Sequence, residues 1–318
     1  MDEQILHKTV TEKYRLDNSG TLTRLTGGEK NIVYKISNLD VVVRVHQPTA
    51  SIDCLEFEHK LRKILSEKMP YVVKPLCYEP GMSFFYLGDY PVSVEPFISG
   101  VKPTRRDCMD LGFCHSAGNI LGQLHSTAAE SAGRLPTLTS RVPIIEMDPF
   151  CNQFYDWDAA VGWLSTTRFA PELPYMKNRL EDLTAYIKKR KCMPFIPIHG
   201  DYYKGNLLWD GKDITGVIDF DDAMLDWAEY EIAKGLWEFT RKYDALELDR
   251  TRMEAFLNGY SSSNSGVTHD MELYMNLNKL IRLHEILATA ASMVNGGLIY
   301  GWTAEDDEYH WNNLLWSR

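Results

Sequence analysis

Residues 198 to 223 read IHGDYYKGNLLWDGKDITGVIDFDDA, and no other segment of this 318-residue chain is as informative. Asp201 follows a His-Gly pair, Asn206 lies five residues later, and Asp219 lies thirteen residues after Asn206. Apolar runs flank these residues, which predicts a loop followed by a β-hairpin. A loop that supplies an Asp and an Asn, with a hairpin that returns a second Asp, brings three oxygen-bearing side chains into one small volume.

Phosphoryl transfer from ATP uses such a set of groups. One carboxylate orients the attacking hydroxyl, while an amide oxygen and a second carboxylate hold Mg²⁺ on the phosphates. The structural alternative is a polar turn between two strands, in which Asp201 caps backbone donors and residues 219–222 form a solvated turn. The Asn and the Ile-Asp-Phe at their fixed positions favour the functional interpretation.

At these residues the chain resembles the aminoglycoside phosphotransferase and choline kinase family, which has the protein-kinase-like fold. The family pattern is His-Gly-Asp, an Asn five residues after the Asp, and a hairpin Asp followed by Phe or Trp. The resemblance implies that Asp201 is the catalytic base or hydroxyl-orienting group, that Asn206 and Asp219 bind Mg²⁺, and that ATP is the donor. One departure is Glu231 in place of the usual Asp, which leaves its bracing of the catalytic loop open.

Composition excludes several classes of protein. The apolar content of 44% and charged content of 25% are ordinary for a globular chain, and no apolar run is long enough to span a membrane. Six scattered cysteines without a Cys-x-x-Cys pair argue against a zinc site and for a reducing cytoplasm. The net charge of −10 disfavours nucleic acid as a partner and mildly favours a cationic small-molecule substrate. Nothing in the sequence indicates the oligomeric state.

The first hundred residues are predicted to be rich in β-structure. Residues 32–36 and 41–45 are β-branched runs separated by a hairpin turn. Gly27 and Gly28 precede the first of these runs, where the family has a flexible loop, and the resemblance implies that this loop contacts the nucleotide phosphates.

Arg44 is a cation within a strand of valines, which is unusual. The resemblance implies that it occupies the phosphate-pairing position, where its guanidinium can clamp phosphate oxygens bidentately. An edge strand with Arg44 in solvent is the alternative, and Lys35 on the preceding strand is the competing candidate. A helix predicted over residues 53–68 offers Glu56 and Glu58 as acids that could hold Arg44, and Glu58 fits the family pattern better.

Residues 92–100 resemble the last strand of the small lobe and the hinge, where main-chain groups at Glu95 and Phe97 would meet adenine. Further helices are predicted over residues 118–128, over much of 145–190 and over 271–294. His125 in the first of these is interpreted as a core histidine rather than a catalyst. The spacing Asp226-x-x-Glu229 predicts a capping box.

We therefore predict an α+β, bilobal protein-kinase-like fold. Its small antiparallel β N-lobe, residues 1–97, would bind the nucleotide, and its larger, mainly helical C-lobe, residues 98–318, would carry the catalytic loop, metal site and substrate site. The predicted activity is the ATP- and Mg²⁺-dependent phosphorylation of a hydroxyl on a small molecule, as in aminoglycoside phosphotransferases.

Other activities stay open at this point. The chain could be a metabolic kinase of homoserine, choline or a sugar, a protein Ser/Thr kinase of the same fold, or a nucleotide-binding pseudokinase without catalysis. The intact Asp201, Asn206 and Asp219 argue against the pseudokinase. A metal-dependent hydrolase is disfavoured because no His cluster has ligand spacing.

Overall fold

The computed structural model describes residues 2–25, 31–190, 194–242, 247–294 and 303–318. The chain divides into two compact units: unit 1 comprises Met1–Lys102, Ser131–Ser140 and Gly205–Ala223, and unit 2 comprises Pro103–Glu130, Arg141–Lys204 and Met224–Arg318. Within the described residues, every helix is too short or too polar to cross a membrane. The boundary expected between residues 97 and 98 stays a prediction.

Unit 1 is built on a five-stranded antiparallel sheet in the order β1-β2-β3-β5-β4. Its strands and helices are β1 (Leu22–Arg24), β2 (Ile32–Ile36), β3 (Val41–Val45), β4 (Phe84–Leu87), β5 (Tyr90–Pro96), α1 (Glu3–Tyr14) and α2 (Ile52–Leu65). Strand β3 lies between β2 and β5, so the alternative of an edge strand with Arg44 in solvent is wrong.

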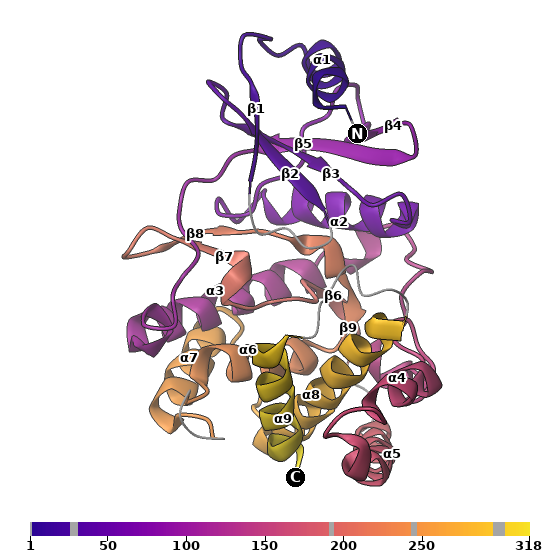
Figure 1. Ribbon diagram of the computed structural model, residues 1–318. Coiled ribbons are helices and arrows are strands. Elements are labelled where there is room, and N and C mark those ends of the chain that lie inside the picture. The colour runs from indigo at the N-terminus through magenta and orange to yellow at the C-terminus, as the bar shows by residue number, and fades with distance from the viewer. Residues whose placement is uncertain (1, 26–30, 191–193, 243–246, 295–302) are drawn as a thin grey trace. The chain divides into compact units, whose positions relative to one another are not determined.

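The two faces of this sheet bury different chemistry, because successive side chains of a strand point to opposite sides. Val43 and Val45 of β3 pack with α1 in an apolar core that also contains Val92 and Val94 of β5. The alternate positions of the same strands carry polar groups, which bond to side chains of α2. Figure 1 shows α1 and α2 on opposite sides of the sheet.

A hairpin completes unit 1. Its strands are β7 (Leu207–Trp209) and β8 (Ile214–Val217), and the 3₁₀ turn η6 (Phe220–Asp222) follows and packs against α2. The hairpin is fixed within the unit by backbone bonds, from the Val217 amide to the Tyr71 carbonyl at 2.9 Å and between Val101 and Trp209 at 2.8 and 2.9 Å. Asp219 is thereby held between β8 and η6.

Unit 2 is mainly helical. Its elements are η1 (Asp107–Met109), α3 (Leu111–Ala129), η3 (Ile144–Glu146), α4 (Trp157–Leu164), η4 (Ala170–Glu172), α5 (Leu173–Lys189), β6 (Ile196–Ile198), β9 (Met224–Asp226), α6 (Ala228–Thr240), α7 (Arg250–Ser263), α8 (Met271–Val294) and α9 (Ala304–Ser317). Strands β6 and β9 pair in antiparallel fashion, with Ile198 opposite Met224. This short ribbon leads directly into the loop that carries Asp201.

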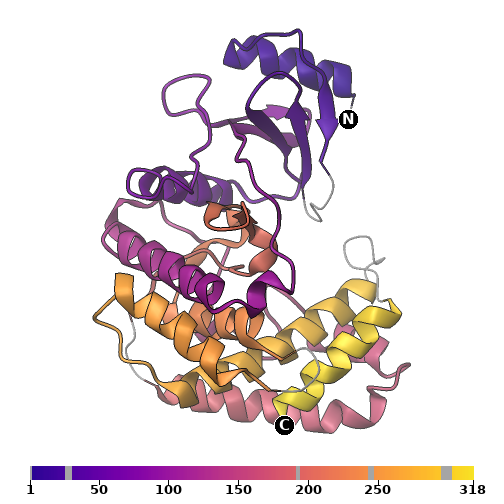
Figure 2. The same ribbon diagram turned by 90° about the vertical axis from the view of Figure 1, so that its left-hand side faces the viewer.

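Helices α3 and α7 approach each other so closely that only glycine fits at the contact. A Cβ on Gly118 would lie 1.9 Å from the Phe256 carbonyl oxygen, and one on Gly259 would lie 2.0 Å from that of His115. Figure 2 shows the two helices side by side, α3 in purple and α7 in orange. Backbone-to-backbone packing of this kind makes a rigid base for α6, which contacts both helices.

Several predicted elements match the structure and others differ. The strands over residues 32–36 and 41–45 and the helix over 271–294 have the predicted bounds. The helix predicted over 53–68 ends at Leu65, and the one over 118–128 begins earlier because Asp110 caps it through the Phe113 amide. Residues 145–190 form two helices rather than one long helical region, with Pro171 and Pro174 at the starts of η4 and α5.

The capping box predicted at Asp226 and Glu229 is wrong. Trp227 is the N-cap of α6 and makes no side-chain capping bond. Asp226 is instead fully buried, where it accepts hydrogen bonds from the amides of Ile144 at 2.8 Å and Trp227 at 2.7 Å. Burial raises the pKa of Asp226 to about 7, against the effect of those two bonds.

Candidate functional site

Arg44 is the centre of a buried ionic cluster in unit 1. Its side chain lies on the α2 side of the sheet and the residue is 5% exposed. One guanidinium nitrogen, Nη1, lies 3.2 Å from Glu58 Oε1, and Nη2 lies 2.6 Å from Asp221 Oδ1 and 3.2 Å from Asp219 Oδ1. The predicted pairing of Arg44 with Glu58 is present, and the structure adds Asp221 to it.

Arg62, which sequence reasoning missed, extends this cluster along α2. Its guanidinium donates to Glu58 at 3.0 Å and to Glu95 of β5, and its Nε donates to the Val73 carbonyl at 3.0 Å. The signal was available, because Glu58 and Arg62 stand four residues apart on one helix and therefore face each other. The prediction for Glu95 concerned its main chain at the adenine hinge. The structure shows in addition that its side chain pairs with Arg62 of α2.

Among the residues that the structure describes, two guanidinium groups face the four carboxylates of Glu58, Glu95, Asp219 and Asp221. Burial and the charge of Asp221 raise the pKa of Glu58 to about 7, although both arginines oppose that shift. Burial lowers the pKa of Arg44 but its acidic neighbours, Asp221 first, outweigh this and hold that pKa well above its usual value.

Asp219 has the left-handed backbone conformation, with φ 65° and ψ 62°. This region disfavours residues with a Cβ by about 1–2 kcal/mol, so the surrounding structure has to impose it. The Ile218 amide donates to the Asn206 carbonyl at 3.0 Å, which ties the start of the hairpin to the residue before Asp219. The Asp219 side chain stays 47% exposed, and so is accessible to a ligand.

The donor set fits a hard divalent cation. Carboxylate oxygens of Asp219 and Asp221 already converge on one cationic nitrogen of Arg44, and Asn206 lies at the base of the same hairpin. Among the described residues no group of three His, Cys, Asp or Glu forms a self-sufficient metal site. Mg²⁺ is commonly held by one or two carboxylates together with substrate phosphates, and this set has that composition.

Asp201 lies in unit 2, directly after β6. Its loop is braced by Glu231 of α6, whose carboxylate accepts hydrogen bonds from the amides of His199 at 3.1 Å and Gly200 at 2.6 Å. His125 of α3 contacts the same carboxylate at 2.9 Å and contacts the Tyr260 hydroxyl at 2.9 Å with its other ring nitrogen. The departure from Asp to Glu at 231 therefore preserves the brace, and His125 is a core histidine as interpreted.

The electrostatics of this brace favour a charged Glu231. Burial by itself raises the pKa of Glu231, but the hydrogen bond with His125 and the electrostatic effect of that residue outweigh burial, so the pKa lies below its ordinary value. A carboxylate that stays ionised keeps both loop amides bonded. The Asp201 carboxylate is in turn contacted by the ammonium of Lys234, one turn further along α6, which sequence reasoning also missed. No sequence pattern predicts that contact, because it depends on how α6 packs beside the loop that carries Asp201.

The remaining predicted residues have less direct support. Gly27 and Gly28 lie outside the described residues. The Phe97 amide donates to the Asp40 carbonyl at 2.9 Å, and the Phe97 ring lies 3.6 Å from the ammonium of Lys35. Lys35, the competitor of Arg44, is therefore stacked on an aromatic ring, while Arg44 contacts the acids of the cluster. The adenine contacts at Glu95 and Phe97 stay predictions.

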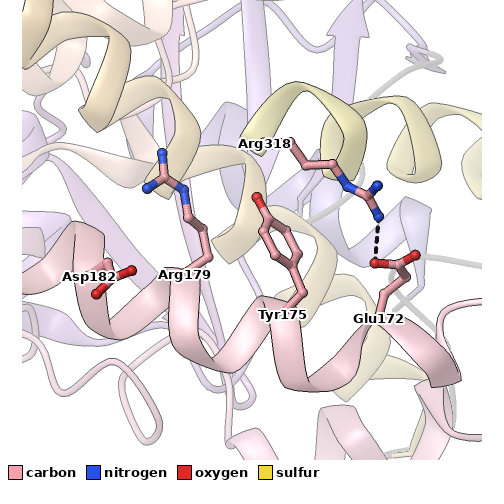
Figure 3. A pocket seen from close by; sticks show the side chains of 5 residues that line it. All are labelled: Glu172, Tyr175, Arg179, Asp182 and Arg318. Carbon is pink, nitrogen blue, oxygen red and sulfur yellow. Dashed lines mark hydrogen bonds and ion pairs between the residues drawn. The ribbon is translucent and has the colours of Figure 1, made fainter.

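A depression of about 580 Å³ occupies another part of unit 2, beside α5 and the end of α9. Figure 3 shows its lining residues, with the ion pair between Arg318 and Glu172 at 2.6 Å. The lining residues are Glu172, Tyr175, Arg179, Asp182 and Arg318. None of them is a predicted site residue, and the Nε of Arg179 donates to the Ser317 carbonyl at 3.0 Å.

Comparison with known proteins finds a matching family. A family model described as "Phosphotransferase enzyme family" matches residues 21–263. A homoserine kinase of Pseudomonas aeruginosa is 27% identical over 215 residues, which cover 65% of this chain and 60% of that relative. The match thus spans less than two thirds of the relative's own length.

Solved structures show the same fold. An amicoumacin kinase in complex with AMP-PNP and Ca²⁺ aligns with a TM-score of 0.74 at 17% identity, covering 100% of this chain and 93% of that one. A microcompartment-associated aminopropanol kinase aligns with a TM-score of 0.70 at 17% identity, covering 99% and 95%. The predicted α+β, protein-kinase-like fold, with an antiparallel sheet and a larger helical part, is confirmed.

Proposed function

The chain belongs to the phosphotransferase enzyme family, and on this premise we propose that it transfers the γ-phosphoryl group of ATP to a hydroxyl group of a small molecule. The observation that carries the proposal is the cluster around Arg44. The carboxylates of Asp219 and Asp221 both contact its Nη2, and the buried carboxylate of Glu58 contacts its Nη1. Phosphoryl transfer rests on positioning and on charge stabilisation, and these residues supply both.

The donor side of the proposal assigns roles in unit 1. Asn206 and Asp219 would hold Mg²⁺, which when bound neutralises charge on the transferred phosphate. Arg44 would bind phosphate oxygens through its bidentate guanidinium, and Glu58 holds that guanidinium in place. The Gly27-Gly28 segment would approach the phosphates through its amides, and the main chain at Glu95 and Phe97 would meet adenine.

The acceptor side assigns Asp201. Its carboxylate would accept, or orient, the proton of the attacking hydroxyl, so that the oxygen points at the phosphorus. The brace from Glu231 to the amides of His199 and Gly200 fixes the loop that presents it. Both contacts are made by a charged, fully buried carboxylate, which is a strong restraint on loop position.

The names of two relatives suggest a class of acceptor. Homoserine and aminopropanol, named in two of them, are small molecules that carry a hydroxyl and an amine. We propose an acceptor of this size and kind, an amino alcohol or a hydroxy amino acid, before an aminoglycoside.

A coupled ADP-release assay with ATP and Mg²⁺ tests the proposal across homoserine, aminopropanol, choline, sugars and aminoglycosides. We expect one acceptor to raise ADP release at least about tenfold above the rate without acceptor, with the product phosphorylated on oxygen by mass spectrometry. Asp201→Asn is the matched inactive control. ATP binding without turnover of any acceptor class would instead support the pseudokinase.

A further inference from the structure

Lys234 makes two contacts with the loop that carries Asp201. Its ammonium pairs directly with the Asp201 carboxylate and also donates to the Gly200 carbonyl at 3.3 Å. The Lys234 side chain is only 14% exposed, whereas that of Asp201 is 31% exposed. The lysine is therefore set behind the carboxylate, and the carboxylate keeps an accessible side.

Two further titratable side chains lie near the pair. Tyr230 lies one turn before Lys234 on α6, and Glu285 of α8 also acts electrostatically on the ammonium. The Glu285 carboxylate is occupied by Arg282 at 2.8 Å and by the Tyr309 hydroxyl at 3.3 Å.

These neighbours determine the charge state of Lys234. Burial disfavours the ammonium, but Asp201 first and then Tyr230 and Glu285 outweigh burial, so the pKa of Lys234 lies above its ordinary value. On the loop side, the Asp201 amide donates to Nδ1 of His199 at 3.2 Å, while Glu231 faces the loop amides. Lys234 thus stays positively charged across the physiological range.

We propose that Lys234 is a positioning residue that fixes the orientation of the Asp201 carboxylate and balances its charge toward the acceptor. This inference rests on the proposed function, in which Asp201 orients the acceptor hydroxyl. Two anchors on neighbouring groups, a carboxylate and a carbonyl, restrict the rotamer of Asp201 as well as its charge. Precise positioning of this kind is worth about 10–100-fold in rate.

The positive charge of Lys234 bears on the class of acceptor. A bare Asp201 would attract an acceptor that carries an ammonium near its hydroxyl. With Lys234 on the carboxylate this attraction is cancelled, so an acceptor whose own carboxylate balances its amine is accepted as well. Lys234 therefore removes a preference for a singly charged amino alcohol over a zwitterionic hydroxy amino acid.

The experiment compares Lys234→Met and Lys234→Arg with the wild type. Lys242→Met is the matched control, because it removes another lysine–carboxylate pair of unit 2, that with Glu247. For Lys234→Met we expect kcat to fall about 10–100-fold with the Kd for ATP unchanged, and Lys234→Arg to recover part of the loss. The ratio of kcat/KM for aminopropanol to that for homoserine should rise about fivefold, since one positive charge is removed.

A second measurement does not require turnover. In ¹³C NMR titrations of selectively labelled aspartate carboxyls, the resonance that disappears in Asp201→Asn is assigned to Asp201. In Lys234→Met its midpoint should move up by about one pH unit or more, because a neighbouring positive charge is lost. An unchanged midpoint, or equal losses of kcat in Lys234→Met and Lys242→Met, overturns the inference. If the wild type phosphorylates no acceptor, the proposed function fails, while the titration still decides the role of Lys234.

Discussion

Arg44 and Glu58 form an ion pair that is buried between the central strand of the sheet and α2, with 3.2 Å between Nη1 and Oε1. Each residue has further partners. Arg44 also contacts Asp219 and Asp221, and Glu58 also contacts Arg62. The pair thus connects α2, the sheet and the turn after the β7–β8 hairpin within one unit.

Arg44→Met should raise the KM for ATP strongly, because it removes both the charge and the bidentate donor. Arg44→Lys keeps the charge and should raise it only modestly. Glu58→Gln should reproduce part of the Arg44→Met defect, and the double variant should add little, as expected for residues that act as a unit. Steady-state kinetics and ATP binding test this. Normal ATP binding in Arg44→Met, together with a defect in Lys35→Met, would transfer the phosphate role to Lys35.

Asp219→Ala should weaken Mg²⁺-dependent nucleotide binding more than Asn206→Ala, because Asp219 offers a full negative charge and Asn206 only an amide dipole. The measurement is a Mg²⁺ titration at fixed ATP. Asp221→Ala should have a smaller effect, since Asp221 mainly pairs with Arg44 at 2.6 Å. A wild-type titration in Asp219→Ala with a defect in Asp221→Ala would make Asp221 the metal ligand.

Asp201→Asn should lower kcat by about 10²–10⁴-fold and leave the Kd for ATP nearly unchanged, because the carboxylate acts on the acceptor hydroxyl and not on the phosphates. The two constants are measured on the same preparations, by coupled assay and by calorimetry. Activity within about tenfold of the wild type contradicts the assigned role.

Asp226 should make the stability of the protein decrease as pH rises. Its folded-state pKa of about 7 lies above its ordinary value of 3.8, so the folded state holds the proton more tightly than the unfolded chain. Its contribution is complete below about pH 4 and is lost as pH rises through about 7. The free energy of unfolding of Asp226→Asn, minus that of the wild type, should therefore increase from pH 5 to about pH 8. Urea unfolding at the two pH values measures this difference.

The exposed Asp182→Asn is the control for this prediction, and its stability relative to wild type should be the same at both pH values. A constant difference between Asp226→Asn and wild type across that range would show that Asp226 does not take up a proton on folding.

The sequence was sufficient where local pattern and tertiary structure agree. The β-branched runs of β2 and β3 and the long apolar face of α8 have the bounds that their periodicity predicts. The region over residues 145–190 was less predictable, because many aromatic side chains hide where one helix ends. Asp156 caps α4 through the Ala159 amide, and two prolines begin the next helical segment.

The candidate site was predictable in its motif residues and not in their partners. The spacing along the sequence was enough to single out Asp201, Asn206 and Asp219. Lys234 and Asp221 gain their contacts from the packing of α6 and from the turn after β8, which the linear pattern does not encode. Glu231 shows the reverse case, since an apparent departure from the family pattern keeps its hydrogen bonds in three dimensions.

Strand β3 borders two interiors that follow different rules. On the α1 side, Val43 and Val45 belong to an apolar core, in which one aliphatic residue can replace another at modest cost. On the α2 side, Arg44 belongs to a web of charges in which no member can change alone without leaving a partner unmatched. Adjacent positions of this strand therefore tolerate substitution differently. Val43 and Val45 can each be replaced singly by another aliphatic residue, whereas a change at Arg44 requires matching changes in its acidic partners.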